Sequence, residues 1–91
     1  MKEYQTIPCT IQAAEWTGRS LNDARAFCKQ HNMPEFTVGS INGMTGLIIP
    51  TPEGDHVAQR GDFIIKGLRG EYYPCKPDVF HLKYELVTTS I

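Results

Sequence analysis

The sequence predicts a small α+β domain covering residues 1–91, with one main helix packed on a strongly bent antiparallel β-sheet. A short helical turn is expected near the C-terminus. Three observations lead to this prediction. Residues 21–31 repeat apolar side chains at helical spacing. Most of the remainder alternates short β-type runs with turn-forming residues. The length of 91 residues and a hydrophobic content of 41% suit a single globular domain.

The first element is an extended segment over residues 4–16. Ile7, Cys9 and Ile11 alternate there with polar residues, as in a half-buried strand. Pro8 lies inside this run and cannot donate to a sheet ladder. We therefore expect an edge strand or a bulge at Pro8.

The main helix is expected from Leu21 to about His31. Ser20 is a favourable N-cap, and Asp23 three residues later completes a capping box. The helix should end at Asn32-Met33-Pro34, because the residue before a proline avoids helical geometry. Its predicted apolar face consists of Leu21, Ala24, Phe27, Cys28 and His31.

The rest of the chain predicts β-hairpins. Strands over 36–41 and 44–49 flank Asn42-Gly43, a strong signal for a type I′ turn. Turns at 50–54 and 59–62 enclose a short strand at 56–58. A second hairpin joins 63–66 to 71–73 through a tight turn near Arg69-Gly70. Pro77 predicts a helical turn through His81, and 82–88 a closing strand.

Charge and composition argue against several classes of protein. The formal net charge is −1, so we expect no broad surface for a long nucleic acid or a membrane. No segment has the apolar run of a signal peptide or the roughly 20 apolar residues of a transmembrane helix. The three cysteines are scattered, which indicates reduced thiols in a cytoplasm.

We expect neither enzymatic activity nor a metal ion or cofactor. Cys28 with His31, or Cys75 with His81, has the composition of half a zinc site, but no second pair follows at the required spacing. Cys75 as a nucleophile would need a base and an orienting group, which no motif supplies. The segment 67–70 lacks the Gly-Lys-Ser/Thr ending of a phosphate-binding loop and predicts a hairpin turn.

A cluster of cationic and aromatic side chains lies between residues 60 and 80. Cations beside aromatic rings are what a nucleotide requires, because they bind its phosphates and stack on its bases. Lys66 shares a strand face with apolar Ile64, so its ammonium group either reaches a ligand or a partner, or covers apolar surface. Trp16 is either a stacking platform or a core anchor. The members of the cluster are Arg60, Phe63, Lys66, Arg69, Tyr72, Tyr73, Lys76 and Phe80.

The segment 61–85 resembles the C-terminal signature of a large family of very small phage and prophage proteins. Its members carry Pro-Gly-Asp-aromatic-Ile-Ile-Lys-Gly-x-x-Gly-Glu-aromatic-Tyr-Pro-Cys-Lys-Pro-Asp-Ile-Phe, usually followed by Tyr-Glu. The chain matches this pattern except at Arg60, where proline is usual, and conservatively at Val79. The segment 11–18, Ile-Gln-Ala-Ala-Glu-Trp-Thr-Gly, also resembles the opening strand of that family.

This resemblance, together with the cation-aromatic cluster, points to the sponge proteins with which phages sequester cyclic nucleotide signals of bacterial immunity. It implies a protein that binds a cyclic di- or trinucleotide without cleaving it, at an interface in a homodimer or homotetramer, in the cytoplasm of the infected host. Lys66, Arg69 and Lys76 would then contact phosphates, Tyr73 and Trp16 would stack on bases, Gly67 would allow close backbone approach, and Arg60 would add a phosphate contact or lie in a solvated loop.

Two other functions fit the same sequence. The chain is alternatively a protein-interaction module that inhibits a host factor or assists phage assembly. An exposed apolar strand edge at 63–68, pairing with a partner chain, would favour that function. It could also bind RNA or single-stranded DNA through the same aromatic residues, although the acidic balance of charge counts against this.

Overall fold

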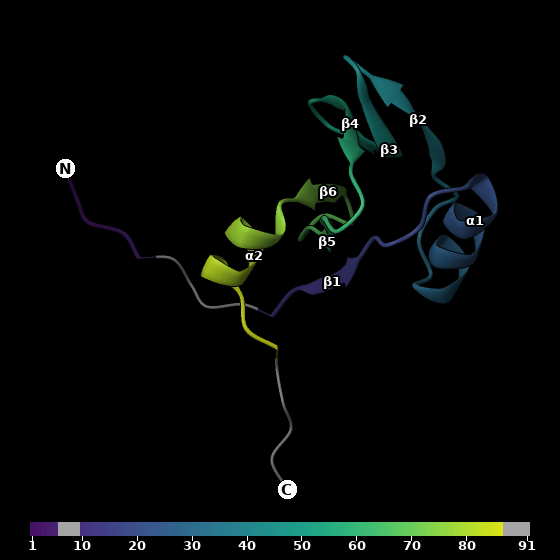
Figure 1. Ribbon diagram of the computed structural model, residues 1–91. Helices are drawn as coiled ribbons and strands as arrows, with labels where there is room; N and C mark the ends of the chain where they lie inside the picture. The colour runs from purple at the N-terminus through teal and green to yellow at the C-terminus, as the bar shows by residue number, and fades with distance from the viewer. Residues whose placement is uncertain (6–9, 87–91) are drawn as a thin grey trace, which may run out of the picture.

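The computed structural model describes residues 1–5 and 10–86, and it confirms an α+β fold (Figure 1). The helices and strands, in chain order, are β1 (Gln12–Glu15), α1 (Leu21–Gln30), β2 (Thr37–Ile41), β3 (Met44–Thr51), β4 (Gly54–Ala58), β5 (Phe63–Lys66), β6 (Tyr72–Cys75) and α2 (Pro77–Lys83). Neither of these helices is long and apolar enough to cross a bilayer.

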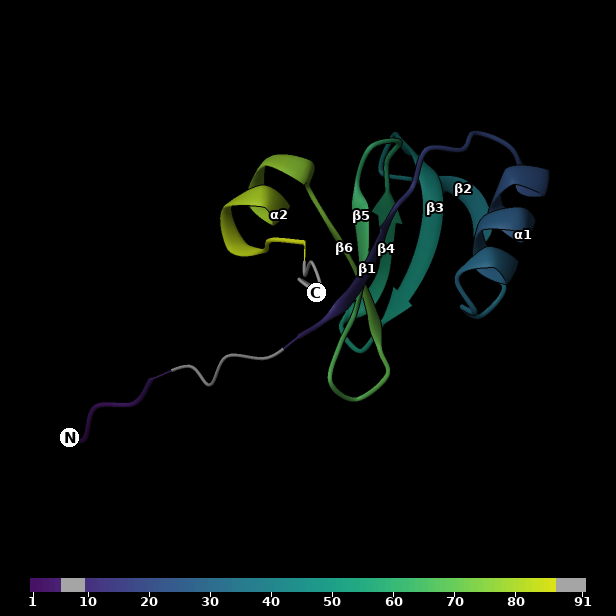
Figure 2. The ribbon, with the colours of Figure 1, turned by 90° about the horizontal axis from the view of Figure 1, so that it is seen from below.

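The strands form two antiparallel sheets of three strands each, in the orders β1-β5-β6 and β2-β3-β4. The predicted bent sheet is thus divided where residues 59–62 lead from β4 to β5, with Gly61 at a φ of 97°. In both views the two helices lie on opposite sides of the strands (Figures 1 and 2). Helix α1 packs towards the β2 end, and α2 follows directly from β6.

The start of α1 has the predicted capping box. The Asp23 N–H donates to the Ser20 hydroxyl at 3.1 Å, and the Ser20 N–H donates to the Asp23 carboxylate at 3.0 Å. The Arg19 N–H donates to the same carboxylate oxygen at 2.9 Å. These hydrogen bonds, with that of Arg19 the largest cause, lower the pKa of Asp23 below its usual value. An ionised Asp23 therefore closes the N-terminus of α1.

One hydrophobic core lies between α1 and the inner faces of the two sheets. It contains Trp16, which is 1% exposed and meets the Phe27 ring edge-on at a centroid distance of 5.3 Å. Ile64 comes from the first sheet, and Leu47 and Ile49 from the second. Trp16 is therefore a core anchor, and its predicted role as a stacking platform is wrong because its ring is covered by protein.

The first hairpin confirms the prediction from Asn42-Gly43. Both residues have positive φ, 51° and 80°, as a type I′ turn requires. Ile41 consequently pairs with Met44, and β3 runs two residues further than expected, to Thr51.

Other expectations fail at the ends of elements. Leu82 and Lys83 belong to α2 rather than to a closing strand, and residues 84–86 form no strand. Residues 87–88, like Pro8 and Cys9, lie outside the described residues. Leu21 and His31 are exposed, so the buried face of α1 is narrower than predicted and consists of Ala24, Phe27 and Cys28.

We expect Phe27→Ala to lower the free energy of unfolding by about 3–5 kcal/mol, because it removes a buried ring that packs on Trp16. Denaturant unfolding followed by Trp16 fluorescence measures this change. Leu82→Ala is the control: its side chain is exposed, so the change should stay within about 0.5 kcal/mol. Near-wild-type stability of Phe27→Ala would contradict the packing of α1 described above.

Candidate functional site

A cleft of about 220 Å³ lies between β1, the C-terminal end of α1 and the β5–β6 hairpin. We call it the Lys66 cleft. It brings together one cation, several neutral polar groups and one tyrosine ring. Its lining residues are Gln12, Ala13, Ala14, His31, Asn32, Met33, Lys66 and Tyr72.

Three of these residues form a row across the first sheet. Lys66 is directly opposite Gln12 on one neighbouring strand and opposite Tyr72 on the other. Residues that pair directly in an antiparallel sheet point to the same face, so the three side chains lie next to one another. Ile64 has the same orientation two residues earlier and is fully buried. This confirms the prediction that Lys66 shares a face with Ile64.

The end of α1 provides the opposite wall. The His31 N–H donates to the Phe27 carbonyl at 3.1 Å, and the Met33 N–H donates to the Cys28 carbonyl at 2.8 Å. Between them, Asn32 adopts a left-handed conformation with a φ of 54°, which an asparagine tolerates better than most residues. This reversal of the chain presents His31 and Asn32 to the cleft.

Lys66 has no carboxylate partner within the described part of the chain. The ion pairs found there are Arg25 with Glu35 at 3.4 Å and Lys76 with Asp62 at 3.0 Å. The Lys66 side chain is exposed and lies beside neutral polar groups. The cleft therefore carries a positive charge that an anionic ligand could neutralise.

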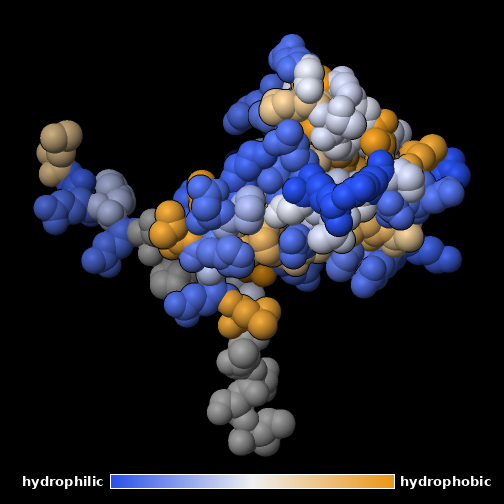
Figure 3. Space-filling view, in the orientation of Figure 1, coloured by the Kyte–Doolittle hydropathy of each residue, from blue (hydrophilic) through white to orange (hydrophobic). Residues whose placement is uncertain are grey.

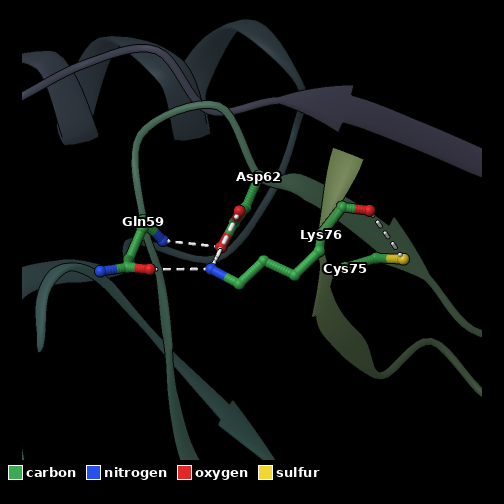
Figure 4. A network of polar contacts seen from close by, with 4 residues as sticks. All are labelled: Gln59, Asp62, Cys75 and Lys76. Atoms are coloured by element: carbon green, nitrogen blue, oxygen red, sulfur yellow. Dashed lines mark hydrogen bonds and ion pairs between the residues drawn. The ribbon is translucent and has the colours of Figure 1, made fainter. Parts of the chain in front are cut away.

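Lys76, in contrast, is engaged in a structural network (Figure 4). Its ammonium group donates to the Gln59 side-chain oxygen at 2.8 Å and to the Asp62 carboxylate at 3.0 Å. The Asp62 carboxylate is buried and also accepts the Gln59 N–H at 2.9 Å. Lys76 thus neutralises a buried anion, and its contacts point to a structural role rather than to phosphate binding.

Arg60 lies away from the Lys66 cleft. Together with Arg19 and the edge of Trp16, it lines a separate hollow of about 200 Å³, which we call the Arg19–Arg60 hollow. The Arg60 Nε–H donates to the Thr17 carbonyl at 3.0 Å. Two of the predicted binding residues, Trp16 and Arg60, are therefore close to each other but not to Lys66.

The remaining predicted residues also lie outside the Lys66 cleft. Tyr73 pairs with Ile65 and so points to the other face of the sheet. Arg69 is exposed in the turn of the β5–β6 hairpin. Gly67 leaves room for the Glu71 side chain, which a Cβ atom would meet, and its N–H donates to the Glu71 carbonyl at 2.7 Å. Its contacts within the protein account for a glycine at this position.

Sequence reasoning missed Gln12 and Asn32 and selected Tyr73 in place of Tyr72. The choice between the two tyrosines depends on hairpin register, because a shift of one residue exchanges the faces. The turn is closed by the Gly70 N–H, which donates to the Gly67 carbonyl at 3.1 Å. A turn over 67–70 would place Lys66 opposite Glu71, whereas the Gly67 N–H donates to the Glu71 carbonyl at 2.7 Å and Lys66 pairs with Tyr72.

We expect Asp62→Ala to destabilise the protein by about 2–3 kcal/mol, because it leaves the partly buried Gln59 N–H without its acceptor and the Lys76 ammonium group without its anionic partner. Lys76→Ala is the comparison variant. The Lys76 side chain is half exposed, so after its removal water can hydrogen-bond to the Asp62 carboxylate in its place. Chemical denaturation measures both. Equal stability of Asp62→Ala and wild type would show that the network is not structural.

Comparisons of the chain with models of known protein families, with curated proteins and with solved structures find no match. Among the described residues, no three His, Cys, Asp or Glu side chains gather as metal ligands would. A proposal for function therefore depends on the geometry of the Lys66 cleft and on the sequence pattern of residues 61–85.

Proposed function

We propose that this protein binds a cyclic di- or trinucleotide without cleaving it. In the cytoplasm of an infected bacterium it would sequester this immune signal and so block anti-phage defence. The observation that carries the proposal is the row of Gln12, Lys66 and Tyr72, which places a cation beside an aromatic ring and an amide in one cleft. The resemblance of residues 61–85 to small phage proteins supports the biological setting.

Each member of the row has a chemical part in this proposal. The Lys66 ammonium group donates charge-assisted hydrogen bonds to a phosphate oxygen. The ring of Tyr72, which is held edge-on by Phe36 at 5.6 Å, provides an apolar surface for a base. The amide groups of Gln12 and Asn32 each offer a donor and an acceptor, as the edge of a nucleobase requires.

The size of the cleft favours a site shared between subunits. Its volume of about 220 Å³ is below the roughly 300–1,000 Å³ of pockets that enclose a whole small-molecule ligand. A cyclic dinucleotide contains two bases and two phosphates, so one cleft accommodates only part of it. Two clefts from two copies would supply matching contacts to the two halves, as a homodimer or homotetramer allows.

The protein-interaction alternative loses its main expected feature. Strand β5 pairs with β1 on one side and with β6 on the other, so residues 63–66 present no open strand edge. The exposed apolar side chains of the described residues include Leu68 in the hairpin turn and Val79, Leu82 and Leu86 on or just after α2, and none of them lies on β5. Figure 3 shows a largely hydrophilic face with small separate apolar patches. Binding of long single strands is disfavoured by the net charge of −1.

Lys66→Ala is expected to abolish binding, because it removes the cation of the cleft, while the exposed position keeps the melting temperature within a few degrees of wild type. Calorimetric titration with a panel of cyclic di- and trinucleotides measures the binding. Lys83→Ala removes an exposed lysine of α2 as a charge-matched control and should bind like wild type. Ligand recovered intact after denaturation would exclude cleavage.

No heat with any member of the panel would contradict the proposal and would direct attention to protein partners. A collapsed Lys66→Ala variant would instead assign Lys66 a structural role. The neutral variant Gln12→Ala then provides a second test, because it alters the same row without removing a charge.

Light scattering should give a mass above the 10.2 kDa of one chain, because the cleft encloses only part of the proposed ligand. The cyclic nucleotide that binds in the calorimetric titration is then added. The measured mass should stay the same or rise to that of a dimer or tetramer. A monomer both with and without ligand would contradict the shared site.

A further inference from the structure

The Arg19–Arg60 hollow is a second positively charged cavity that the proposed cyclic nucleotide site does not use. It lies where the segment between β1 and α1 passes the turn between β4 and β5. The buried ring of Trp16 and the side chain of Val38 provide apolar lining, and Thr45 contributes a hydroxyl group that also shares a 2.7 Å hydrogen bond with the Ser40 hydroxyl. Its two cations come from parts of the chain that are 41 residues apart in sequence.

The fold positions the Arg60 guanidinium group at the hollow. Its Nε–H donates to the Thr17 carbonyl at 3.0 Å, which orients the planar group and leaves the two Nη groups for other acceptors. Arg19 forms no ion pair within the described residues. Its neighbour Gly18 has no room for a Cβ atom, which would meet the Trp16 ring and Asp23. Close packing therefore holds this segment against the apolar lining.

The carboxylate of Asp23, next to this segment, is already committed to the helix terminus. One oxygen of Asp23 accepts the N–H groups of both Arg19 and Ser20. The helix terminus is thus closed by the protein itself, so a ligand would be recognised by the two guanidinium groups. Neither Arg19 nor Arg60 forms an ion pair within the described residues, so the hollow has positive charge beside an apolar wall, where electrostatic attraction is stronger than in water.

We propose that the Arg19–Arg60 hollow binds a phosphate group, either as inorganic phosphate or as the terminal group of a phosphate monoester. Guanidinium groups match phosphate oxygens in paired hydrogen bonds. Three terminal oxygens and a charge near −2 suit two arginines and the Thr45 hydroxyl better than the two oxygens of a carboxylate do. The volume of about 200 Å³ admits such a group.

This site is independent of the Lys66 cleft. The hollow lies at Gly18 and Arg19, before the first turn of α1, whereas the cleft lies at His31 and Asn32, after the last turn. A helix of 10 residues separates the two by about 15 Å. The inference therefore goes beyond the proposed function and does not depend on it.

The test is a titration of the ¹⁵N-labelled protein, followed by NMR at constant ionic strength, with inorganic phosphate, adenosine monophosphate and acetate. Phosphate should shift the amide signals of Gly18, Thr45 and Gly46 to saturation, and acetate should act more weakly. A stronger response to the monophosphate would identify a monoester as the ligand, and an equal response would identify free phosphate. Unsaturable shifts, or equal shifts with acetate, would overturn the proposal as an adventitious ion only.

Variants assign the response to the two arginines. Arg19→Gln and Arg60→Gln should each weaken phosphate binding about tenfold or more. Arg25→Gln removes the same charge from an exposed position on α1 and should leave binding unchanged. If Arg60→Gln disturbs the fold because the hydrogen bond to the Thr17 carbonyl is lost, the effect of Arg19→Gln on phosphate binding is the test of the proposal. Equal phosphate binding by Arg19→Gln and Arg25→Gln would overturn the proposal.

The same variants separate this site from the cyclic nucleotide site. Lys66→Ala should keep the phosphate response, and the Arg19→Gln, Arg60→Gln double variant should keep the binding of cyclic nucleotides. Loss of the phosphate response in Lys66→Ala would overturn the existence of a separate site. Failure of all cyclic nucleotides to bind, with phosphate binding intact, would refute the proposed function and leave this inference standing.

Discussion

Buried Asp62 joins three parts of the chain: the turn over residues 59–62, the N-cap of α2 and Trp16, directly after β1. It accepts the Gln59 N–H at 2.9 Å and the ammonium group of Lys76 at 3.0 Å, and Lys76 is the N-cap of α2. The main-chain oxygen of Asp62 accepts the Trp16 N–H at 2.8 Å. Because a buried charge is costly unless it is paired, Lys76 must stay in place beside the carboxylate. Next to this junction, Glu15 pairs with Phe63. This pairing sets the register of β1 on β5, in which Gln12 lies opposite Lys66.

Local signals were sufficient to predict most elements of the fold. The capping box at Ser20 and the positive-φ turn at Asn42-Gly43 depend on neighbouring residues alone, so the sequence shows them directly. The division into two sheets was not predictable in this way. It depends on the absence of pairing between β4 and β5, which tertiary packing decides. The continuation of α2 over Leu82 and Lys83 was missed because their apolar and charged alternation suits a strand as well as a helix.

The sequence predicted the kinds of chemical group in the candidate site better than it predicted which residues form it. Lys66 was recognised as a cation on an otherwise apolar strand face, which follows from the alternation of side chains. The residues that surround Lys66 depend on the register of the strands and on the position of α1. No local sequence motif indicates either of these. Trp16 and Lys76 have residue types that suit a ligand as well as a core or an ion pair. Burial of Trp16 and the contact of Lys76 with Asp62 distinguish these roles.

The row of Gln12, Lys66 and Tyr72 crosses three hydrogen-bonded strands, so backbone pairing sets its spacing at roughly 4.8 Å per strand. Side chains mounted on such a frame can be exchanged without moving the positions they occupy. Gln12 is exposed on the edge strand β1, where substitution disturbs little packing. Single substitutions at this rim can therefore change which groups the cleft offers to a ligand, while the backbone frame that spaces them stays the same.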